Sequence, residues 1–171
     1  MKLDAFLAEL GSKKGAPGGG AAAALAAAAG AALVEMVARL NAARLKRASG
    51  TAGKAALLRG KLQRLIREDA KAFGRIQKAY KLRKKKPALW QSALKSGARP
   101  PLRIVEYCAA VAKLAQGERK RTNPWLESDR REALILLRAA AQSAWLNVEI
   151  NLKSIDDKKF VQRVRKQRRR L

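Results

Sequence analysis

Residues 15–40, GAPGGGAAAALAAAAGAALVEMVARL, decide the fold that we expect for this chain. Three consecutive glycines, Gly18, Gly19 and Gly20, precede a block made mostly of alanine, the residue with the highest helix propensity. Glycine lets backbone approach a neighbouring group closely, and small side chains let a second helix pack nearby. The stretch therefore predicts a loop and then a long helix, from about residue 20 to 48, at a bundle centre or a subunit interface.

We do not expect this helix to span a membrane. From Gly20 to Val34 it offers 15 uninterrupted apolar residues, against the roughly 20 that cross a bilayer. Glu35 and Arg39 follow directly, and alanine is only weakly hydrophobic.

The rest of the chain also shows helical periodicity and no convincing strand. Its 171 residues predict one domain, residues 1–171, with an all-α fold: a helical bundle of about five to seven helices. The expected order is a helix over 3–10, a loop over 11–20, the alanine helix, a break at 49–53, helices over 54–80 and 88–96, a helix from 100, a polar loop over 117–128, and helices over 129–154 and from 156. Ser154 to Asp157 resembles a capping box.

The helix over 54–80 has an apolar stripe at three- and four-residue spacing. We expect this stripe to face the core: Leu58, Leu62, Leu65, Ile66, Ala70, Phe73, Ile76 and Tyr80. Its opposite face carries Arg64, Arg67, Lys71, Arg75 and Lys78.

The charge of the chain is unusual. Thirty-nine Lys and Arg face thirteen Asp and Glu, a formal net charge of +26, whereas a domain of this size usually carries a charge of about 2 to 8. The cations spread over nearly every polar helix face, without the interleaved aromatic residues typical of dedicated nucleic-acid binders. We therefore expect non-specific binding of polyanions, including nucleic acid, through surface charge.

The residues with reactive side chains are few. Histidine is absent and Cys108 is the only cysteine, so no internal disulfide forms and no metal site is expected. Because the first residues do not look like a secretory signal, the expected compartment is the reducing cytoplasm.

The pattern nevertheless singles out several polar residues. The glycines 18–20 at a helix start suit an anion or a carbonyl oxygen, although a plain helix entry explains them equally well. Asp69 lies at the border of the apolar stripe. Asp129 lies at a helix start, where an N-cap reading with Glu132 is as good as a functional one. Asn147 and Asn151 lie one helical turn apart in an otherwise apolar segment, which indicates a buried polar contact or ligand recognition.

Four blocks of the sequence, in this order, resemble the cyclodeaminase/methenyltetrahydrofolate cyclohydrolase family, which includes the cyclodeaminase half of formiminotransferase-cyclodeaminase. They are FLAELGSKKGAPGGGAAAALAAAAGAALVEMVARL, LIREDAKAFGRIQKAYKL, TNPWLESD and AAAQSAWLNVEINLKSIDD. The resemblance covers nearly the whole chain. It implies an all-α homodimer that binds a reduced folate near the glycines. It also implies that water opens a cyclic amidinium, or that ammonia is lost from formimino-tetrahydrofolate.

The resemblance also implies roles for particular residues. Gly18, Gly19 and Gly20 would cradle the folate, Asp69 and Asp129 would be the catalytic carboxylates, and Lys84, Asn147 and Asn151 would bind the substrate. No cofactor is implied beyond the tetrahydrofolate derivative that is the substrate. The alternative, from the uniform excess of cations, is an engineered, positively supercharged scaffold on this fold with reduced or no activity, which binds or packages anionic partners.

Overall fold

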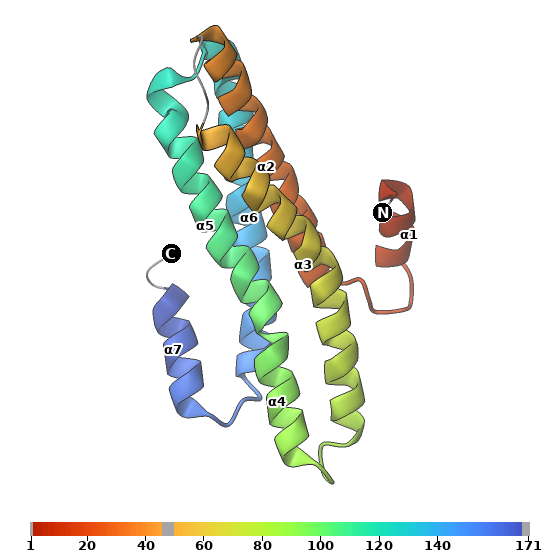
Figure 1. Ribbon diagram of the computed structural model, residues 1–171. Coiled ribbons are helices and arrows are strands. Elements are labelled where there is room, and N and C mark those ends of the chain that lie inside the picture. The colour runs from red at the N-terminus through yellow and green to blue at the C-terminus, as the bar shows by residue number, and fades with distance from the viewer. Residues whose placement is uncertain (1, 46–49, 169–171) are drawn as a thin grey trace.

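The structure is a computed structural model that describes residues 2–45 and 50–168. These residues form seven α-helices and two short 3-10 helices and contain no strand, so the all-α prediction is confirmed. The long helices run side by side as a bundle, with the two terminal helices on its flanks (Figure 1). The elements are α1 (Leu3–Leu10), α2 (Gly19–Arg44), α3 (Gly50–Lys81), α4 (Pro87–Gly97), α5 (Arg99–Glu118), η1 (Arg119–Arg121), η2 (Pro124–Leu126), α6 (Glu127–Leu152) and α7 (Lys158–Arg168).

The alanine-rich helix α2 lies at the centre of the bundle and packs most extensively against α3 and α6. Ala21, Ala24 and Ala27 have no exposed surface. Gly30 marks the close approach to α6, because a Cβ at this position would lie 3.2 Å from the carbonyl oxygen of Ala133. The small residues of α2 therefore serve close helix packing, as the sequence predicted.

α2 is also, by length and composition alone, apolar enough to cross a membrane. More than half of its most apolar window is buried inside the bundle. A core helix passes the same test, so this property is weak support for a membrane span.

The core-facing stripe of α3 differs from the predicted one in its second half. Leu62, Leu65 and Ile66 are buried as expected. Phe73 and Tyr80, in contrast, are 38% and 50% exposed, and Ala72 and Ala79, one residue earlier in each case, are buried instead. The buried stripe thus continues through alanines, and the two aromatic side chains lie beside it.

Several element boundaries also differ from the prediction. α2 ends at Arg44, and residues 46–49, where its end was expected, lie outside the described residues. Gly50 to Gly53 belong to α3 rather than to a break. The predicted polar loop over 117–128 contains the end of α5, both 3-10 helices and the start of α6.

The start of α7 is capped by a different residue from the one predicted. Asp157 Oδ1 accepts a hydrogen bond from the backbone N–H of Phe160 at 2.9 Å. Ser154 lies in the turn that follows α6, where its N–H donates to the carbonyl of Asn151. Asp157 is therefore the capping residue, because it directly precedes the helix and Ser154 does not.

Candidate functional site

The three glycines form the entry of α2, here called the glycine turn (residues 18–20). Gly18 is extended, with φ −128°, and offers no side chain to cap the helix. The first N–H groups of an α-helix have no partner inside the helix, so they point outward as donors. Before the turn, Gly15 has φ +72°, a left-handed conformation that favours glycine.

Asp69 of α3 lies directly against Gly20. A Cβ at residue 20 would lie 2.5 Å from both Cγ and Oδ2 of Asp69, closer than real Cβ atoms approach. The backbone N–H of Ala21 donates to the same carboxylate. Glycine at residue 20 is therefore what lets the Asp69 carboxylate reach the N-terminus of α2.

Two opposing effects act on the pKa of Asp69. Burial removes water from the carboxylate and raises the pKa, and the hydrogen bond from Ala21 lowers it by a smaller amount. The net pKa lies above the usual aspartate value of 3.8. A carboxyl group with a raised pKa is suited to exchange a proton with a bound substrate.

The side chains of Asn147 and Asn151 face the same region from α6. Asn147 Nδ2 lies 3.6 Å from the Cβ position of Gly19. The amide nitrogens are used within α6, since Asn147 donates to the Ser143 carbonyl at 3.1 Å and Asn151 to the Asn147 carbonyl at 2.8 Å. Within the described part of the chain, neither side-chain oxygen accepts a hydrogen bond, so both are left for other donors.

Gly97, at the end of α4, belongs to the same region and was not predicted from the sequence. A Cβ at Gly97 would clash with Ile76 of α3 and would lie 3.4 Å from Asn151 Oδ1. The signal was present as a lone glycine in an otherwise helical stretch, just before Pro100 and Pro101.

The structure thus brings together the glycine turn, Asp69 and Asn147, with Asn151 one helical turn further along α6. It does not bring Asp129 to them. Asp129 is half-buried in the first turn of α6 and lies about 27 Å along that helix from Asn147, at 1.5 Å per residue. Within one chain, therefore, Asp69 and Asp129 do not share a site, and a catalytic role for Asp129 stays a prediction.

The predicted N-cap role of Asp129 is also not seen. The residue that precedes α6 is Leu126, whose side chain does not cap the helix.

Lys84 is exposed in the turn that follows α3. The last residue of α3, Lys81, lies about 18 Å along the helix from Asp69. The predicted part of Lys84 in substrate binding likewise stays a prediction.

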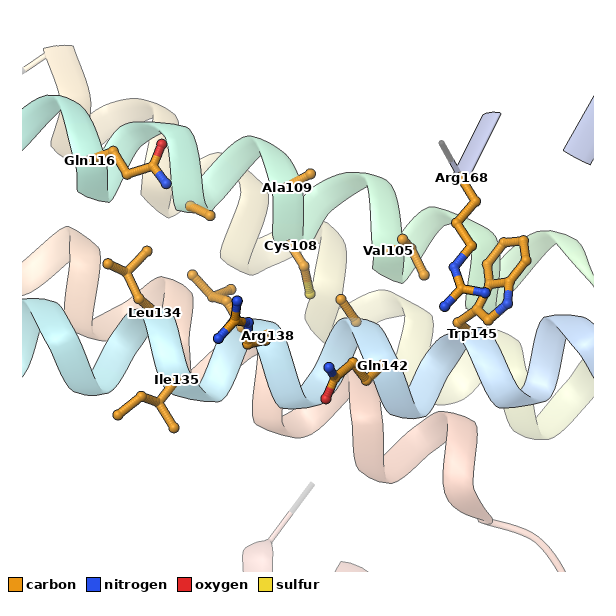
Figure 2. A pocket seen from close by; sticks show the side chains of 13 residues that line it. Val105, Cys108, Ala109, Gln116, Leu134, Ile135, Arg138, Gln142, Trp145 and Arg168 are labelled. Atoms are coloured by element: carbon orange, nitrogen blue, oxygen red, sulfur yellow. The ribbon is translucent and has the colours of Figure 1, made fainter. Parts of the chain in front are cut away.

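The surface has hollows away from the glycine turn. One of about 520 Å³ lies between α5 and α6, with an apolar floor that includes Cys108 and with Arg138 and Arg168 beside it (Figure 2). Burial raises the pKa of the Cys108 thiol to about 12, so this cysteine is not a nucleophile at neutral pH. This hollow is formed by other helix faces than those that carry Gly19 and Asp69.

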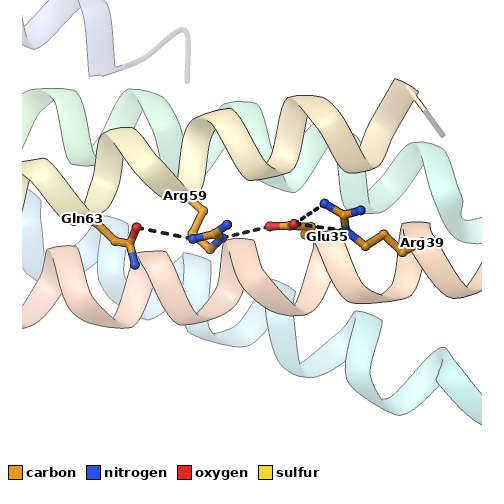
Figure 3. Close-up of polar contacts among 4 residues, drawn as sticks. All are labelled: Glu35, Arg39, Arg59 and Gln63. Atoms are coloured by element: carbon orange, nitrogen blue, oxygen red, sulfur yellow. Dashed lines mark hydrogen bonds and ion pairs between the residues drawn. The ribbon is translucent and has the colours of Figure 1, made fainter. Parts of the chain in front are cut away.

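Glu35 of α2 shows what a purely structural acid looks like in this chain. It accepts from Arg39 on its own helix at 2.8 Å and from Arg59 on α3 at 2.9 Å, and Arg59 also reaches Gln63 (Figure 3). These hydrogen bonds, that of Arg59 first, hold the pKa of Glu35 below its usual value. In contrast to Glu35, Asp69 forms no ion pair with any of the described residues, and its pKa is raised rather than lowered. Among the described residues, no group of three Asp, Glu or Cys side chains is placed to hold a metal.

Comparison with known proteins identifies the family. The family model described as formiminotransferase-cyclodeaminase matches residues 2–170. The chain belongs to this family. It is similar to a methenyltetrahydrofolate cyclohydrolase of Methylorubrum extorquens, with 34% identity over 94% of this chain and 83% of that protein.

Two further relatives support the same family. A formimidoyltransferase-cyclodeaminase of Sus scrofa is 33% identical over 95% of this chain but only 32% of its own length. The crystal structure of formiminotetrahydrofolate cyclodeaminase from Thermotoga maritima matches with a TM-score of 0.88 and 29% identity, over 97% of this chain and 85% of that one. The fold of this chain is therefore that of the cyclodeaminase members of the formiminotransferase-cyclodeaminase family.

Proposed function

We propose that this chain is a folate-processing enzyme that hydrolyses methenyl-tetrahydrofolate or deaminates formimino-tetrahydrofolate. The observation that carries the proposal is the half-buried Asp69 carboxyl, which lies against Gly20 at the N-terminus of α2 and has no ion-pair partner among the described residues. The relatives named for these two reactions share the family and the fold.

Hydrolysis of a methenyl-folate requires few catalytic groups. The amidinium carbon of a methenyl-folate is already an electrophile, so a positioned water and a carboxyl group that takes its proton are sufficient. Water adds to this carbon and gives its proton to Asp69. The bond from the carbon to one ring nitrogen then breaks as that nitrogen takes the proton from Asp69, and the new hydroxyl releases its own proton to solvent as it becomes the formyl carbonyl. In the deaminase direction a folate nitrogen attacks the formimino carbon instead, and the leaving group is ammonia.

The glycines and the two asparagines take binding roles in this proposal. The glycine turn offers backbone N–H donors, and Asn147 and Asn151 offer side-chain oxygens to the N–H groups of the pterin. Lys84 and Asp129 lie away from this cluster, so the proposal assigns the proton transfer to Asp69 alone.

The test is an assay with the purified chain and methenyl-tetrahydrofolate, followed by the loss of its near-ultraviolet absorbance against the rate without protein. Ammonia release from formimino-tetrahydrofolate is measured in parallel. Asp69→Asn is expected to abolish turnover, whereas Glu132→Gln, which removes an exposed acid next to Asp129, leaves it unchanged. A folded chain without either activity would overturn the proposal and favour the supercharged, inactive scaffold.

We also propose that the chain binds polyanions without sequence preference. Exposed lysines and arginines lie on α2, α3, α5, α6 and α7. Among the described residues, six cations form an ion pair with a carboxylate. Such binding arises from release of counterions and therefore weakens steeply with salt. Binding that persisted at high salt for one nucleic-acid sequence alone would contradict it.

We further propose a homodimer formed through α6. Ile135, Leu146 and Ile150 are 66%, 66% and 68% exposed and lie on one stripe of this helix. Large exposed apolar patches on a protein surface mark protein–protein contact sites. A second copy of the chain, which presents the same stripe, would cover it.

A further inference from the structure

A hollow of about 330 Å³ between α3 and the start of α5 carries a concentration of positive charge. Lys71 and Arg75 line it from α3, and Arg99 and Arg103 line it from α5. Glu68 and Ser96 complete its polar wall. The wall therefore carries a formal net charge of +3.

The positive charge of the hollow is poorly neutralised by the protein. Arg103 approaches Glu68 at 3.9 Å, and both side chains are about half exposed, so this pair is weak. Within the described part of the chain, Lys71, Arg75 and Arg99 have neither an ion pair nor a side-chain hydrogen bond. Four cations around one hollow repel each other, and an anion bound between them relieves that repulsion.

Two residues that line the hollow are direct chain neighbours of residues in the candidate region. Glu68 directly precedes Asp69 on α3, and Lys71 and Arg75 continue from Glu68 at three- and four-residue spacing, on a face turned away from Asp69. Ser96 directly precedes Gly97, which faces Asn151. In Figure 1, α3 lies beside the α4–α5 segment along this stretch.

We propose that this hollow binds a ligand with two or more neighbouring anionic groups, carboxylates or phosphates. Arginine side chains bind both groups through paired hydrogen bonds, and three of the four cations are arginines. The wall contains no aromatic residue on which a nucleobase would stack. The source is either the carboxylate-bearing tail of a folate bound at the candidate site or a free phosphate compound, and only the first source rests on the proposed function.

Binding is tested first without turnover. The full chain is titrated with pyrophosphate and with a triglutamate peptide by calorimetry, at a fixed low salt concentration. The variant Arg75→Gln/Arg99→Gln is compared with Lys113→Gln/Arg131→Gln, which removes the same charge from exposed positions outside the hollow. We expect at least tenfold weaker binding of one or both ligands in the first variant and less than a twofold change in the second.

Equal weakening of binding in both variants would overturn the proposal, because the binding would then depend only on the overall charge of the chain. The absence of binding by the unaltered chain would overturn it as well. Circular dichroism confirms that both variants are folded. Because these titrations need no catalysis, they succeed or fail independently of the enzyme proposal.

The source of the anion is tested with two substrates. If the substrate tail occupies the hollow, Arg75→Gln/Arg99→Gln raises KM for methenyl-tetrahydrofolate, and leaves kcat and the KM for the methenyl-pteroate analogue, which lacks glutamate, unchanged. If KM is unchanged for both substrates while pyrophosphate binding is lost, the ligand is a free phosphate compound. Both results support an anion site and assign its source.

Discussion

The carboxylate of Asp69 occupies the space that a side chain at Gly20 would fill. A Cβ at residue 20 would lie 2.5 Å from Asp69 Cγ, and the next backbone N–H, that of Ala21, donates to the carboxylate. The glycine and the aspartate are thus mutually required, because one makes the room that the other uses.

Gly20→Ala is therefore expected to displace Asp69. We expect the free energy of unfolding to fall by about 1–3 kcal/mol, as for an overpacked core, and kcat/KM to fall with it. Urea denaturation and the absorbance assay measure the two effects. Gly53→Ala is the control: its Cβ would meet no atom within 4 Å, so stability is expected to rise, by about 0.5–1 kcal/mol. Unchanged stability in Gly20→Ala would show that Asp69 does not hold this position.

Asp69→Asn separates a catalytic role from a capping role. The amide oxygen still accepts from Ala21, but it cannot take a proton from water. We expect kcat/KM to fall by about 10²- to 10⁴-fold. If Asp69 served only to cap α2, the variant would keep its activity.

The pH dependence of stability tests the environment of Asp69. Burial raises its pKa in the folded protein, so its favourable contribution is present below the unfolded pKa and is lost as the pH rises through the folded pKa. Near neutral pH the buried carboxylate therefore costs stability, and Asp69→Asn is expected to unfold at an equal or higher urea concentration than the unaltered chain. A lower midpoint at pH 7, with an equal midpoint in acid, would contradict the raised pKa.

Glu35→Gln tests the opposite case. Hydrogen bonds from Arg59 and Arg39 lower the pKa of Glu35, so its contribution is present above the unfolded pKa and lost as the pH falls through the folded one. We expect the variant to lose about 0.5–1 kcal/mol at pH 7 and to match the unaltered chain in acid. Denaturation curves at both pH values measure this. A constant difference at all pH values would show that the loss comes from packing and not from charge.

Local signals in the sequence were sufficient to predict the helices and to select candidate site residues, whose functional roles stay predictions. Helical periodicity and the small residues of α2 predicted the bundle, and the glycine turn, Asp69 and Asn147 were singled out before their contact was seen. The contact between Gly20 and Asp69 joins residues far apart in the chain, so no spacing in the sequence reveals it. The separation of Asp129 from Asn147, in contrast, was readable, because 18 residues on one helix cannot meet.

Other differences arise from packing that only the structure shows. Phe73 and Tyr80 fit the periodicity of a buried stripe, yet Ala72 and Ala79 are buried in their place. Periodicity gives the direction of the buried face to within about one residue, and the space between helices then decides which side chain lies there. Gly97 was missed for the same reason, because its neighbour Ile76 comes from another helix.

The excess of cations is expected to make stability depend on salt. With a formal charge of +26, the folded chain repels itself, and salt screens this repulsion. We expect Tm to rise as sodium chloride increases from low to physiological concentration. The matched control is a variant with two exposed lysines changed to glutamate, for example Lys113→Glu/Lys153→Glu, in which the rise is expected to be smaller. A Tm that falls with added salt would show that specific ion pairs dominate instead.

Leu146→Asp tests the proposed dimer surface on α6. Leu146 is 66% exposed and lies between Ile135 and Ile150 on the stripe, so a carboxylate there would be buried against the second copy at a large cost in free energy. We expect the unaltered chain to sediment as a dimer and the variant as a folded monomer in analytical ultracentrifugation. Leu57→Asp, which alters a leucine of α3 that is 57% exposed, is expected to leave the dimer intact. A monomeric unaltered chain, or dimers in both variants, would show that α6 does not form the interface.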